Sequence, residues 1–592
     1  MYTCGYEEES PIPSSINQTF IGKLGKPGET IVNPTGETIS MQTSGNDTYI
    51  GMYTQTGGTA INEGKIEITG NTGTAIGILG DGQNTIENKG IINVSGENAY
   101  GIKVIDGTDT SITNSGEINV SASSDAYGIY IEENGNLATV TNTGTISING
   151  NLNDKNNAIV LNGAELRNQN QFNVEGDLNI ASLQASAFVV ERGSQITAQS
   201  VEGELTAGIS TVQSNENKDQ YVEENSVVAN DTSNLEVKSE SALFKASTQI
   251  NSKGNTNIVL DRKDFKEFTP NSSMGEYLNQ NYQDGNFVDT FNSMKEATSA
   301  FDIASKSVKF MGADNMLNFV DENIQVLRGL NRNIAETILT PDDDKPYRVL
   351  SGAHNYSLET DDKGLLSGYD INSNSVYMFG DKRLNNWSRL GLGLSFTDIN
   401  SSYEHGGSRD LSYVNIFVPY LYKFNPNLNL ASILSFGYGY GDFERDAIHT
   451  SELSQFTYGL TNELRYKIDV NGFIELEPAL MLNALGYHEK GLNEGKDDTA
   501  IITKNNHALS VEAGLGLFVK KEVKTSENSK LGFKIGGIYY HEFASPYRDI
   551  TARHRASNYW YKINDYANLY KRDRAVFESV IDYMYIDKSL YM

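Results

Sequence analysis

A ten-residue phrase recurs along the first third of the chain and constrains the fold more than any other feature. It reads INEGKIEITG from Ile61, and related phrases begin at Ile86, Ile112, Val140 and Leu166. The aligned asparagines are separated by 26, 26, 28 and 26 residues, at positions Asn62, Asn88, Asn114, Asn142 and Asn168. A fixed period of this length is typical of a stacked repeat architecture, in which each repeat contacts mainly its neighbours.

Each copy combines turn residues with a short alternating apolar pattern. The asparagine is followed two residues later by glycine, except in the last copy, where Asn170 takes that place. Both residue types tolerate left-handed backbone angles and favour turns. Two β-branched or aromatic residues then stand two positions apart, as in Ile66 and Ile68. This spacing predicts a strand with one buried face.

A second apolar phrase lies between the copies, for example TAIGIL at 74–79. The sequence therefore predicts two short strands per repeat, joined by polar turns. One repeat cannot bury its apolar face, but stacked repeats can, because each strand pairs with its equivalent at about 4.8 Å. We expect a right-handed parallel β-helix, with the asparagines stacked in ladders inside it or at its corners.

The placement of histidine excludes several kinds of active site from the first 350 residues. All seven histidines lie beyond that point, at His354, His405, His449, His488, His507, His541 and His554. A Ser-His-Asp triad, a Cys-His pair or a histidine-ligated zinc site therefore cannot form there. A carboxylate-only glycosidase stays open, although acidic residues such as Asp106, Asp109, Glu132 and Glu133 form no distinctive pair. The formal charge of −29 argues against nucleic acid as a partner, and no cofactor or metal is expected.

The ends of the chain carry no recognisable export signal. The N-terminal sequence, MYTCGYEEESPIPSS, has neither a basic start nor an apolar segment, so it does not resemble a signal peptide. No stretch of 18 apolar residues predicts a membrane-spanning helix. We expect the chain to be incomplete at this end.

A helical segment follows the repeats. The stretch from Asn315 to Leu339 carries apolar residues near helical spacing and stops before Pro341. Its opposite side carries Arg328, Asn331, Arg332 and Asn333.

From Pro346 the period changes to two, in longer strands. In FTYGLTNELRYKI one face carries Phe456, Tyr458 and Leu460, whereas the other carries charged residues and glycine. Apolar residues outside and polar residues inside are typical of a membrane β-barrel, so Glu463, Arg465, Glu475 and Glu477 are predicted to face the lumen. Strands are expected to start near residues 346, 365, 388, 410, 428, 451, 472, 507, 530, 558 and 574. A twelfth begins at Ser589 and is incomplete, so we also expect the C-terminal end to be cut short.

The order of these parts resembles classical (type V) autotransporters. The most specific stretch is AFDIASKSVKFMGADNMLNFVDENIQVLRGL at 300–330, which is similar to the helices that precede the barrel in that family. The repeats resemble, more weakly, the passengers of fusobacterial-type adhesin autotransporters. The resemblance implies an all-β chain with these parts: an irregular N-terminus (1–20), a β-solenoid passenger (21–262, repeats clearest at 48–176), a helical junction (263–340) with a pore helix (315–339), and a twelve-stranded translocator barrel (341–592).

The resemblance also implies a location and a mechanism. The barrel would lie in the Gram-negative outer membrane, in contact with its lipid, after delivery by periplasmic chaperones and the barrel-assembly machinery. The passenger would cross it C-terminus first and remain at the cell surface. Some relatives cut themselves beside an asparagine in the pore helix, so the region containing Arg328, Asn331, Arg332 and Asn333 is a candidate cleavage region.

Three functions follow from these observations. The first is a non-enzymatic adhesin or aggregation factor that binds ligands on host cells or other bacteria. The alternative is a passenger acting as a carboxylate-dependent glycosidase or lyase, and a cleft with two convergent carboxylates about 5–10 Å apart would favour it. The third is a soluble solenoid with an unrelated β-domain, which requires the apolar face of the C-terminal strands to be buried.

Overall fold

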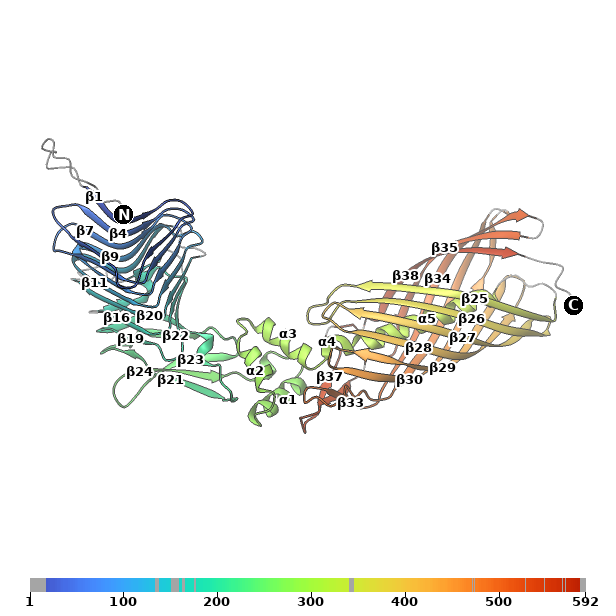
Figure 1. Ribbon diagram of the computed structural model, residues 1–592. Coiled ribbons are helices and arrows are strands. Elements are labelled where there is room, and N and C mark those ends of the chain that lie inside the picture. The colour runs from blue at the N-terminus through green and yellow to red at the C-terminus, as the bar shows by residue number, and fades with distance from the viewer. Residues whose placement is uncertain are drawn as a thin grey trace. The chain divides into compact units, whose positions relative to one another are not determined.

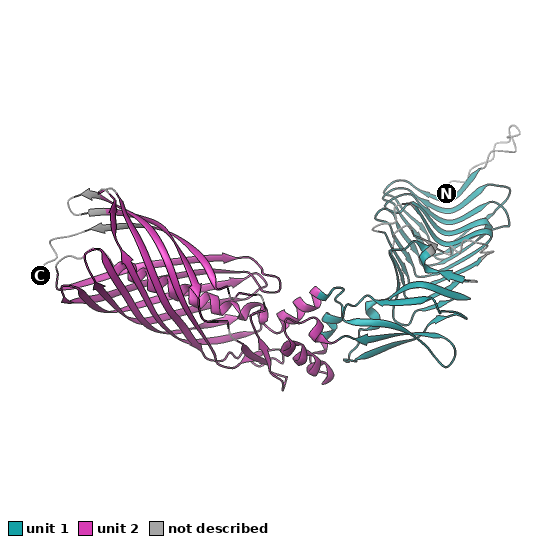
Figure 2. Cartoon of the chain, turned by 180° about the vertical axis from the view of Figure 1, so that it is seen from behind, with its two compact units in different colours: residues 1–263, 291–300 teal, residues 264–290, 301–592 magenta. Residues whose placement is uncertain are grey.

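The computed structural model describes most of the chain, as two compact units (Figure 2). The described residues are 18–133, 138–150, 159–161, 165–174, 177–339, 345–470, 472, 474–526, 529–547, 549–566, 568–569 and 571–585. Unit 1 comprises Met1–Lys263 and Phe291–Ala300, and unit 2 comprises Asp264–Thr290 and Phe301–Met592.

Unit 1 is a parallel β-solenoid with three strands in each complete coil (Figure 1). The first face contains β1 (Thr19–Gly25), β4 (Thr48–Thr54), β7 (Thr74–Gly80), the second halves of β9 (Ile91–Asp106) and β11 (Glu117–Glu133), and β14 (Ile159–Val160). The second face contains β2 (Thr30–Asn33), β5 (Thr59–Asn62), β8 (Thr85–Asn88), β10 (Ser111–Asn114), β12 (Thr139–Asn142), β15 (Glu165–Asn168), β18 (Ala187–Val190), β20 (Ser200–Ala207) and β22 (Leu235–Ser239). The third face contains β3 (Thr38–Gln42), β6 (Lys65–Thr69), the first halves of β9 and β11, β13 (Thr145–Gly150), β16 (Gln171–Val174), β19 (Gln195–Thr197) and β21 (Gln220–Val228).

The expectation of two strands per repeat is wrong. The third strand is the four-residue segment that ends at the recurring asparagine, such as TIEN in β8. In TIEN only Ile86 is apolar, so no alternation of apolar and polar residues marks the segment as a strand. The solenoid also begins one coil earlier than the recognised repeats, because Asn33 pairs in register with Asn62.

The recurring asparagines form a buried ladder, which confirms that expectation. Asn33 and its five equivalents are fully buried at the ends of the second-face strands. Each side-chain amide donates to the carbonyl of the next: Nδ2 to Oδ1 distances are 2.7 Å for Asn33–Asn62, Asn62–Asn88, Asn88–Asn114 and Asn114–Asn142, and 2.8 Å for Asn142–Asn168. The ladder satisfies polar groups that would otherwise be costly to bury.

The glycines that follow these asparagines serve a different purpose from the one expected. Gly64, Gly90, Gly116 and Gly144 do not have positive φ angles. A Cβ added to Gly90 would collide with the backbone oxygen of Gly64, and the same collision recurs between Gly116 and Gly90. Glycine is therefore needed because successive coils approach each other closely at this corner, and not because the turn is left-handed.

The last part of unit 1 closes the solenoid with antiparallel pairing. β24 (Thr256–Arg262) pairs antiparallel with both β21 and β23 (Phe244–Ile250). Shorter elements lie near this end, namely β17 (Asp177–Asn179) and the 3-10 helices η1 (Ile180–Leu183) and η2 (Ile209–Thr211). An antiparallel hairpin covers a parallel edge that would otherwise be open to further pairing.

Unit 2 begins with helices. η3 (Phe265–Glu267) precedes α1 (Ser272–Gln283), whose N-cap Asn271 accepts a hydrogen bond from Met274. α2 (Val288–Lys295) leads into unit 1, and α3 (Ala300–Phe310), α4 (Ala313–Met316) and α5 (Asn318–Ile338) follow in unit 2. None of the helices among the described residues has an apolar stretch sufficient to cross a bilayer.

Ten long antiparallel strands follow and pair in chain order. They are β25 (Tyr347–Thr360), β26 (Tyr369–Asn385), β27 (Ser388–Tyr403), β28 (Ser408–Lys423), β29 (Leu428–Glu444), β30 (Thr450–Tyr466), β32 (Ile474–Glu489), β34 (Asn506–Ser526), β35 (Ser529–Glu542) and β38 (Asp573–Tyr585), with the short β31 (Ile468–Val470) beside β32. β25 and β38 are the two ends of this ladder in the described residues. Connections at one end are long, at 490–505 and 543–572, and those at 386–387 and 424–427 at the other end are short.

The apolar face of these strands points outward. On β27, Leu390, Leu392 and Leu394 are 42%, 63% and 59% exposed, whereas Arg389 and Ser395 on the other face are 2% and 4% exposed. The same alternation holds along β26, β28, β29 and β30. A soluble sheet would bury such a face, so this orientation excludes the soluble solenoid with an unrelated β-domain.

The strand predicted from about residue 558 is wrong. That region instead forms a small separate sheet in which β36 (Ile550–His554) pairs with β33 (Ile501–Thr503) and β37 (Tyr561–Ile563). Its apolar alternation serves the core of this loop sheet, where Ile550, Tyr561 and Ile563 are buried. The strand expected from Ser589 lies outside the described residues.

Candidate functional site: the barrel lumen and its mouth

Helix α5 lies inside the ladder of long strands (Figure 1). Each of the ten strands places at least one residue against it, namely His354, Tyr377, Tyr403, Arg409, Ser435, Arg465, Leu485, Glu512, Lys534 and Glu578. Polar residues of α5 such as Asn318, Glu322 and Asn331 are fully buried by this enclosure. The sheet therefore wraps around the helix as a barrel, and α5 fills its lumen.

The first turns of α5 are held by a buried ion pair. Arg409 of β28 donates to Glu322 at 3.0 Å and to Asn323 at 3.1 Å. Tyr403 and Ser401 of β27 donate to the same carboxylate at 2.7 and 2.8 Å. Both charges are fully buried, so the hydrogen bonds are what make the pair tolerable in this environment.

The middle of α5 is held by Arg328. Its guanidinium donates to both oxygens of Glu512 on β34, at 2.7 and 3.1 Å. Asn483 donates to the same carboxylate at 2.8 Å, and Arg574 of β38 also contacts it. A bidentate arginine–carboxylate pair fixes both position and angle.

The last turns of α5 belong to a larger charge network. Arg465 of β30 donates to Glu336 at 2.9 Å, to Glu477 at 3.1 Å and to Glu463 at 3.0 Å. Lys534 of β35 contacts Glu336 as well. Arg332 approaches Glu463 at 4.0 Å and contacts Glu578 of β38. Seven charged groups from the helix and four strands thus meet in one region.

The two asparagines of the predicted cleavage region are both engaged. The Asn331 side-chain nitrogen donates to the Ser435 hydroxyl at 3.1 Å, and Asn331 is fully buried. The Asn333 side-chain oxygen accepts from Tyr377 at 2.6 Å. Of the predicted lumen residues, the structure brings together Glu463, Arg465 and Glu477, whereas Glu475 lies half-buried near the short turns, opposite Lys520 in register.

Sequence reasoning missed several members of these clusters. Glu336 stands four residues after Arg332 and eight after Arg328, so the i, i+4 spacing along α5 was a usable signal. Glu512 was detectable by strand parity, because the exposed apolar residues Val511 and Leu515 lie on the opposite face of its strand. Arg409 gave no such signal, because its neighbours are Ser408 and Asp410. Which helix residue each would meet could not be predicted, because that depends on how far the helix is inserted.

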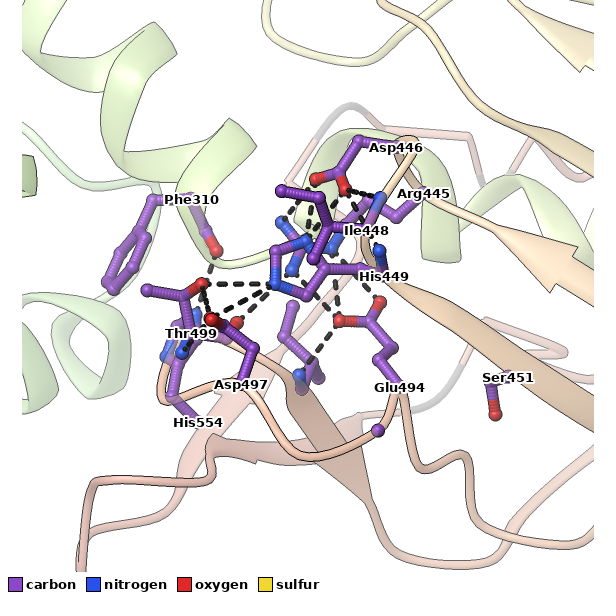
Figure 3. Close-up of polar contacts among 12 residues, drawn as sticks. Phe310, Arg445, Asp446, Ile448, His449, Ser451, Glu494, Asp497, Thr499 and His554 are labelled. Carbon is purple, nitrogen blue, oxygen red and sulfur yellow. Dashed lines mark hydrogen bonds and ion pairs between the residues drawn. The ribbon is translucent and has the colours of Figure 1, made fainter.

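The long connections cover the mouth of the barrel at the end from which α5 begins. Figure 3 shows His449 between Asp446 on one side and Thr499 and Asp497 on the other. His449 Nδ1 lies 2.7 Å from an Asp446 oxygen, and Nε2 lies 3.0 Å from the Thr499 hydroxyl. Beside them Arg445 donates to Glu494 at 2.9 Å, and this carboxylate also accepts from the Ile501 backbone at 2.8 Å.

A carboxylate, an imidazole and a hydroxyl in this order have the arrangement of a nucleophilic triad. The Thr499 hydroxyl, however, donates to Asp497 at 2.5 Å, and its backbone N–H donates to the same carboxylate at 2.8 Å. The hydroxyl proton is therefore held by Asp497 and not by the imidazole. We interpret the cluster as a brace between the 445–449 and 490–500 connections. Among the described residues, no histidine, cysteine or acidic side chains gather in a way that could hold a metal ion.

The loop sheet in turn holds the helices that precede α5. The His554 Nε2 donates to the Phe310 carbonyl at 2.9 Å, so Nδ1 accepts from the Tyr277 hydroxyl at 2.7 Å. Tyr561 donates to the Met311 carbonyl at 2.8 Å. His554 is fully buried, and burial lowers the pKa of its imidazole to about 3. The imidazole is therefore neutral wherever this contact is intact.

Comparison with known families decides what this arrangement is. Residues 351–583 match the family model of the autotransporter beta-domain, which is the translocator of such proteins. The chain is a type V autotransporter. Its barrel lies in the outer membrane with α5 in the lumen, and its solenoid is a passenger at the cell surface.

Other comparisons concern the parts separately. Residues 28–172 match the family model of the BigA third pectate lyase-like domain. Among solved structures, the translocator domain of the autotransporter NalP from Neisseria meningitidis is 11% identical, with 47% of this chain and 99% of that chain covered and a TM-score of 0.34. The ferric-catecholate import receptor Fiu from E. coli K12, in its closed form, is 8% identical, with 41% and 44% covered and a TM-score of 0.20. A search of curated proteins found no match.

Proposed function

We propose that the passenger is a non-enzymatic adhesin or aggregation factor, held at the surface by the barrel. The observation that supports this most is a groove of about 560 Å³ on the third face of the solenoid. All of its lining residues are neutral: Thr69, Asn93, Val94, Ser95, Asn119, Val120, Ser121, Ser147, Ile148, Asn149, Asn173 and Val174. A concave surface that offers hydrogen bonds without ionisable groups is suited to binding rather than to acid–base chemistry.

The test is an adhesion and aggregation assay on Gram-negative cells that display the full chain behind a signal peptide. The adhesin proposal predicts that the displaying bacteria attach to epithelial or bacterial cells more than the same bacteria carrying the empty vector. Removal of the passenger by protease on intact cells should return attachment to the control level. Attachment equal to the empty-vector cells would contradict the proposal.

The second candidate is a passenger with glycosidase or lyase activity. The match of residues 28–172 to a pectate lyase-like domain favours it. A carboxylate-dependent glycosidase requires two carboxylates that converge on one bond, and the groove residues supply none. Incubation of displaying cells with polygalacturonate and with neutral polysaccharides separates the two candidates, because only an enzyme releases reducing or unsaturated ends.

We further propose that the passenger stays covalently attached. Cleavage beside an asparagine requires its side-chain nitrogen to turn toward its own carbonyl carbon. The Asn331 nitrogen is instead directed at Ser435, and Asn333 is held by Tyr377. An immunoblot of outer membranes should show one full-length band, and a barrel fragment that disappears in Asn331→Ala or Asn333→Ala would contradict this. Secretion through an outer-membrane barrel requires three kinds of partner, namely outer-membrane lipid, periplasmic chaperones and the barrel-assembly machinery.

A further inference from the structure

We propose that the groove on the third face binds an uncharged oligosaccharide. The inference rests on the adhesin function proposed above and names the ligand class that its surface would recognise.

The groove carries two rows of hydrogen-bonding side chains on consecutive coils. The register aligns the first row across four coils, at Asn93, Asn119, Ser147 and Asn173. The second row lies two residues further along each strand, at Ser95, Ser121 and Asn149. Because parallel strands are about 4.8 Å apart, amide or hydroxyl groups recur at this step along the solenoid. Such a periodic surface suits a ligand that is itself a chain of similar units.

Two amides of the first row, those of Asn93 and Asn119, are held by a hydrogen bond to each other. The Asn119 side-chain nitrogen donates to the Asn93 oxygen at 2.9 Å. This bond uses one hydrogen and one lone pair, so each amide keeps further donor and acceptor capacity. Groups that can both donate and accept are matched to sugar hydroxyls, which also do both.

The apolar residues between the two polar rows belong to the core of the solenoid. Val94, Val120, Ile148 and Val174 alternate with the polar residues along each strand, so their side chains point inward and only 3%, 2%, 2% and 5% of each is exposed. The groove therefore presents polar side chains to a ligand, and recognition depends on hydrogen bonds.

The electrostatic character of the groove argues for a neutral ligand. The chain has a formal charge of −29, yet the twelve lining residues carry none of it. In the preceding coil, the position equivalent to Asn93 is Glu67, and Lys65 neutralises it at 2.6 Å. An anionic polymer would find no cation in the groove, and a cationic ligand no carboxylate.

The backbone of the groove is not available to a peptide. The strands beneath it already pair on both sides with neighbouring coils, from β6 through β9, β11, β13 and β16. Peptides that bind sheets usually do so by adding a strand at an open edge, and the groove lies on a face. Recognition must therefore use side chains alone.

The test measures binding of defined sugars to cells that display the full chain. The probes are fluorescent neutral oligosaccharides of four to six hexose or N-acetylhexosamine units, and the same chains carrying sialic acid or sulfate. Ser121→Trp fills the groove, and Asn93→Ala with Asn119→Ala removes polar groups without filling it. Ser111→Trp is the matched control, because Ser111 is an exposed strand serine on the second face. Antibody labelling confirms equal display.

The proposal predicts that wild type and Ser111→Trp bind at least one neutral oligosaccharide. Ser121→Trp and the double alanine variant should lose at least about tenfold in affinity, and charged versions should bind no better than the neutral chain. Unchanged binding in Ser121→Trp, binding of charged chains only, or no binding of any probe would each overturn the proposal. Adhesion measured on the same cells distinguishes the groove assignment from the adhesin function. Adhesion without sugar binding overturns the groove assignment alone, whereas absence of adhesion overturns the adhesin function.

Discussion

Acid should loosen the contact between the loop sheet and the helices that precede the pore helix. The contact depends on His554, whose Nδ1 accepts from Tyr277 and whose ring stacks on Phe310 with centroids 4.0 Å apart. A proton on Nδ1 would remove that acceptor and place a charge beside Arg445 in a fully buried site. The pKa of the imidazole is therefore about 3 in the folded protein, against about 6.5 when the contact is open.

The sign and size of the effect follow from these two values. A group whose folded pKa is depressed contributes stability that is present above its open-state pKa and is lost as pH falls. Each pH unit below about 6.5 favours the open form by roughly 1.4 kcal/mol until the folded pKa is reached. At about pH 5 the contact should be weaker by about 2 kcal/mol, which raises the population of the open form roughly 30-fold.

Hydrogen exchange measured by mass spectrometry on the full chain in detergent micelles can test this. Exchange in segments 272–283 and 550–563 should become faster at pH 5 than at pH 7, after correction for the intrinsic pH dependence of exchange. His554→Gln does not titrate, so its corrected rates should be similar at both pH values. Acid should instead strengthen the contact between His405 and Asp314, because that hydrogen bond raises the pKa of the His405 imidazole. Equal corrected rates in wild type at pH 5 and pH 7 would refute the reasoning.

Three further predictions concern the other buried polar groups. Arg465→Met should destabilise the barrel by roughly 3–5 kcal/mol, because it leaves buried carboxylates without a partner; heat-dependent migration in SDS gels should reveal it, with the exposed Lys382→Met unchanged. Asn114→Leu should cost the passenger roughly 1–3 kcal/mol in urea unfolding, since it interrupts the ladder and leaves buried amides unsatisfied, and a loss no larger than in Thr113→Leu would contradict the role of the ladder. Buried Lys295 contacts the Tyr221 hydroxyl at 2.9 Å, and burial lowers the pKa of its ammonium group to about 8. Above that pH the folded passenger loses the buried charge while the unfolded chain still binds the proton. Passenger stability should therefore increase from about pH 8 to 10 in wild type and not in Lys295→Met.

Much of the fold could be predicted from the sequence because its signals are local and repeated. The 26-residue period indicates stacking, and the alternation in the C-terminal strands separates a lumen face from a lipid face. The strand near residue 558 was mispredicted because alternation shows only that one face of a segment is buried. It does not show whether a barrel or a loop sheet buries that face.

The candidate site was predictable only in part. Strand parity assigned Glu463, Arg465 and Glu477 to the lumen. Helical spacing placed Arg328 and Arg332 on the polar side of the pore helix. Their pairing could not be predicted, because Arg328 meets Glu512 and Glu336 meets Arg465 only at one depth of the helix in the barrel. The passenger groove was not predictable either, since Asn93 and Asn119 look like ordinary exposed strand residues until the coils align them.

The sequence by itself determined that the chain has a stacked solenoid, a helix and a lipid-facing barrel, because periodicity is a property of neighbouring residues. The tertiary structure decided which charges pair in the lumen, how the loop sheet closes on His554 and where the solenoid is hollowed. These features join residues that are up to hundreds of positions apart, as in the contact between Tyr277 and His554. Distances of that kind are set by how the coils and strands pack, and no local pattern carries that information.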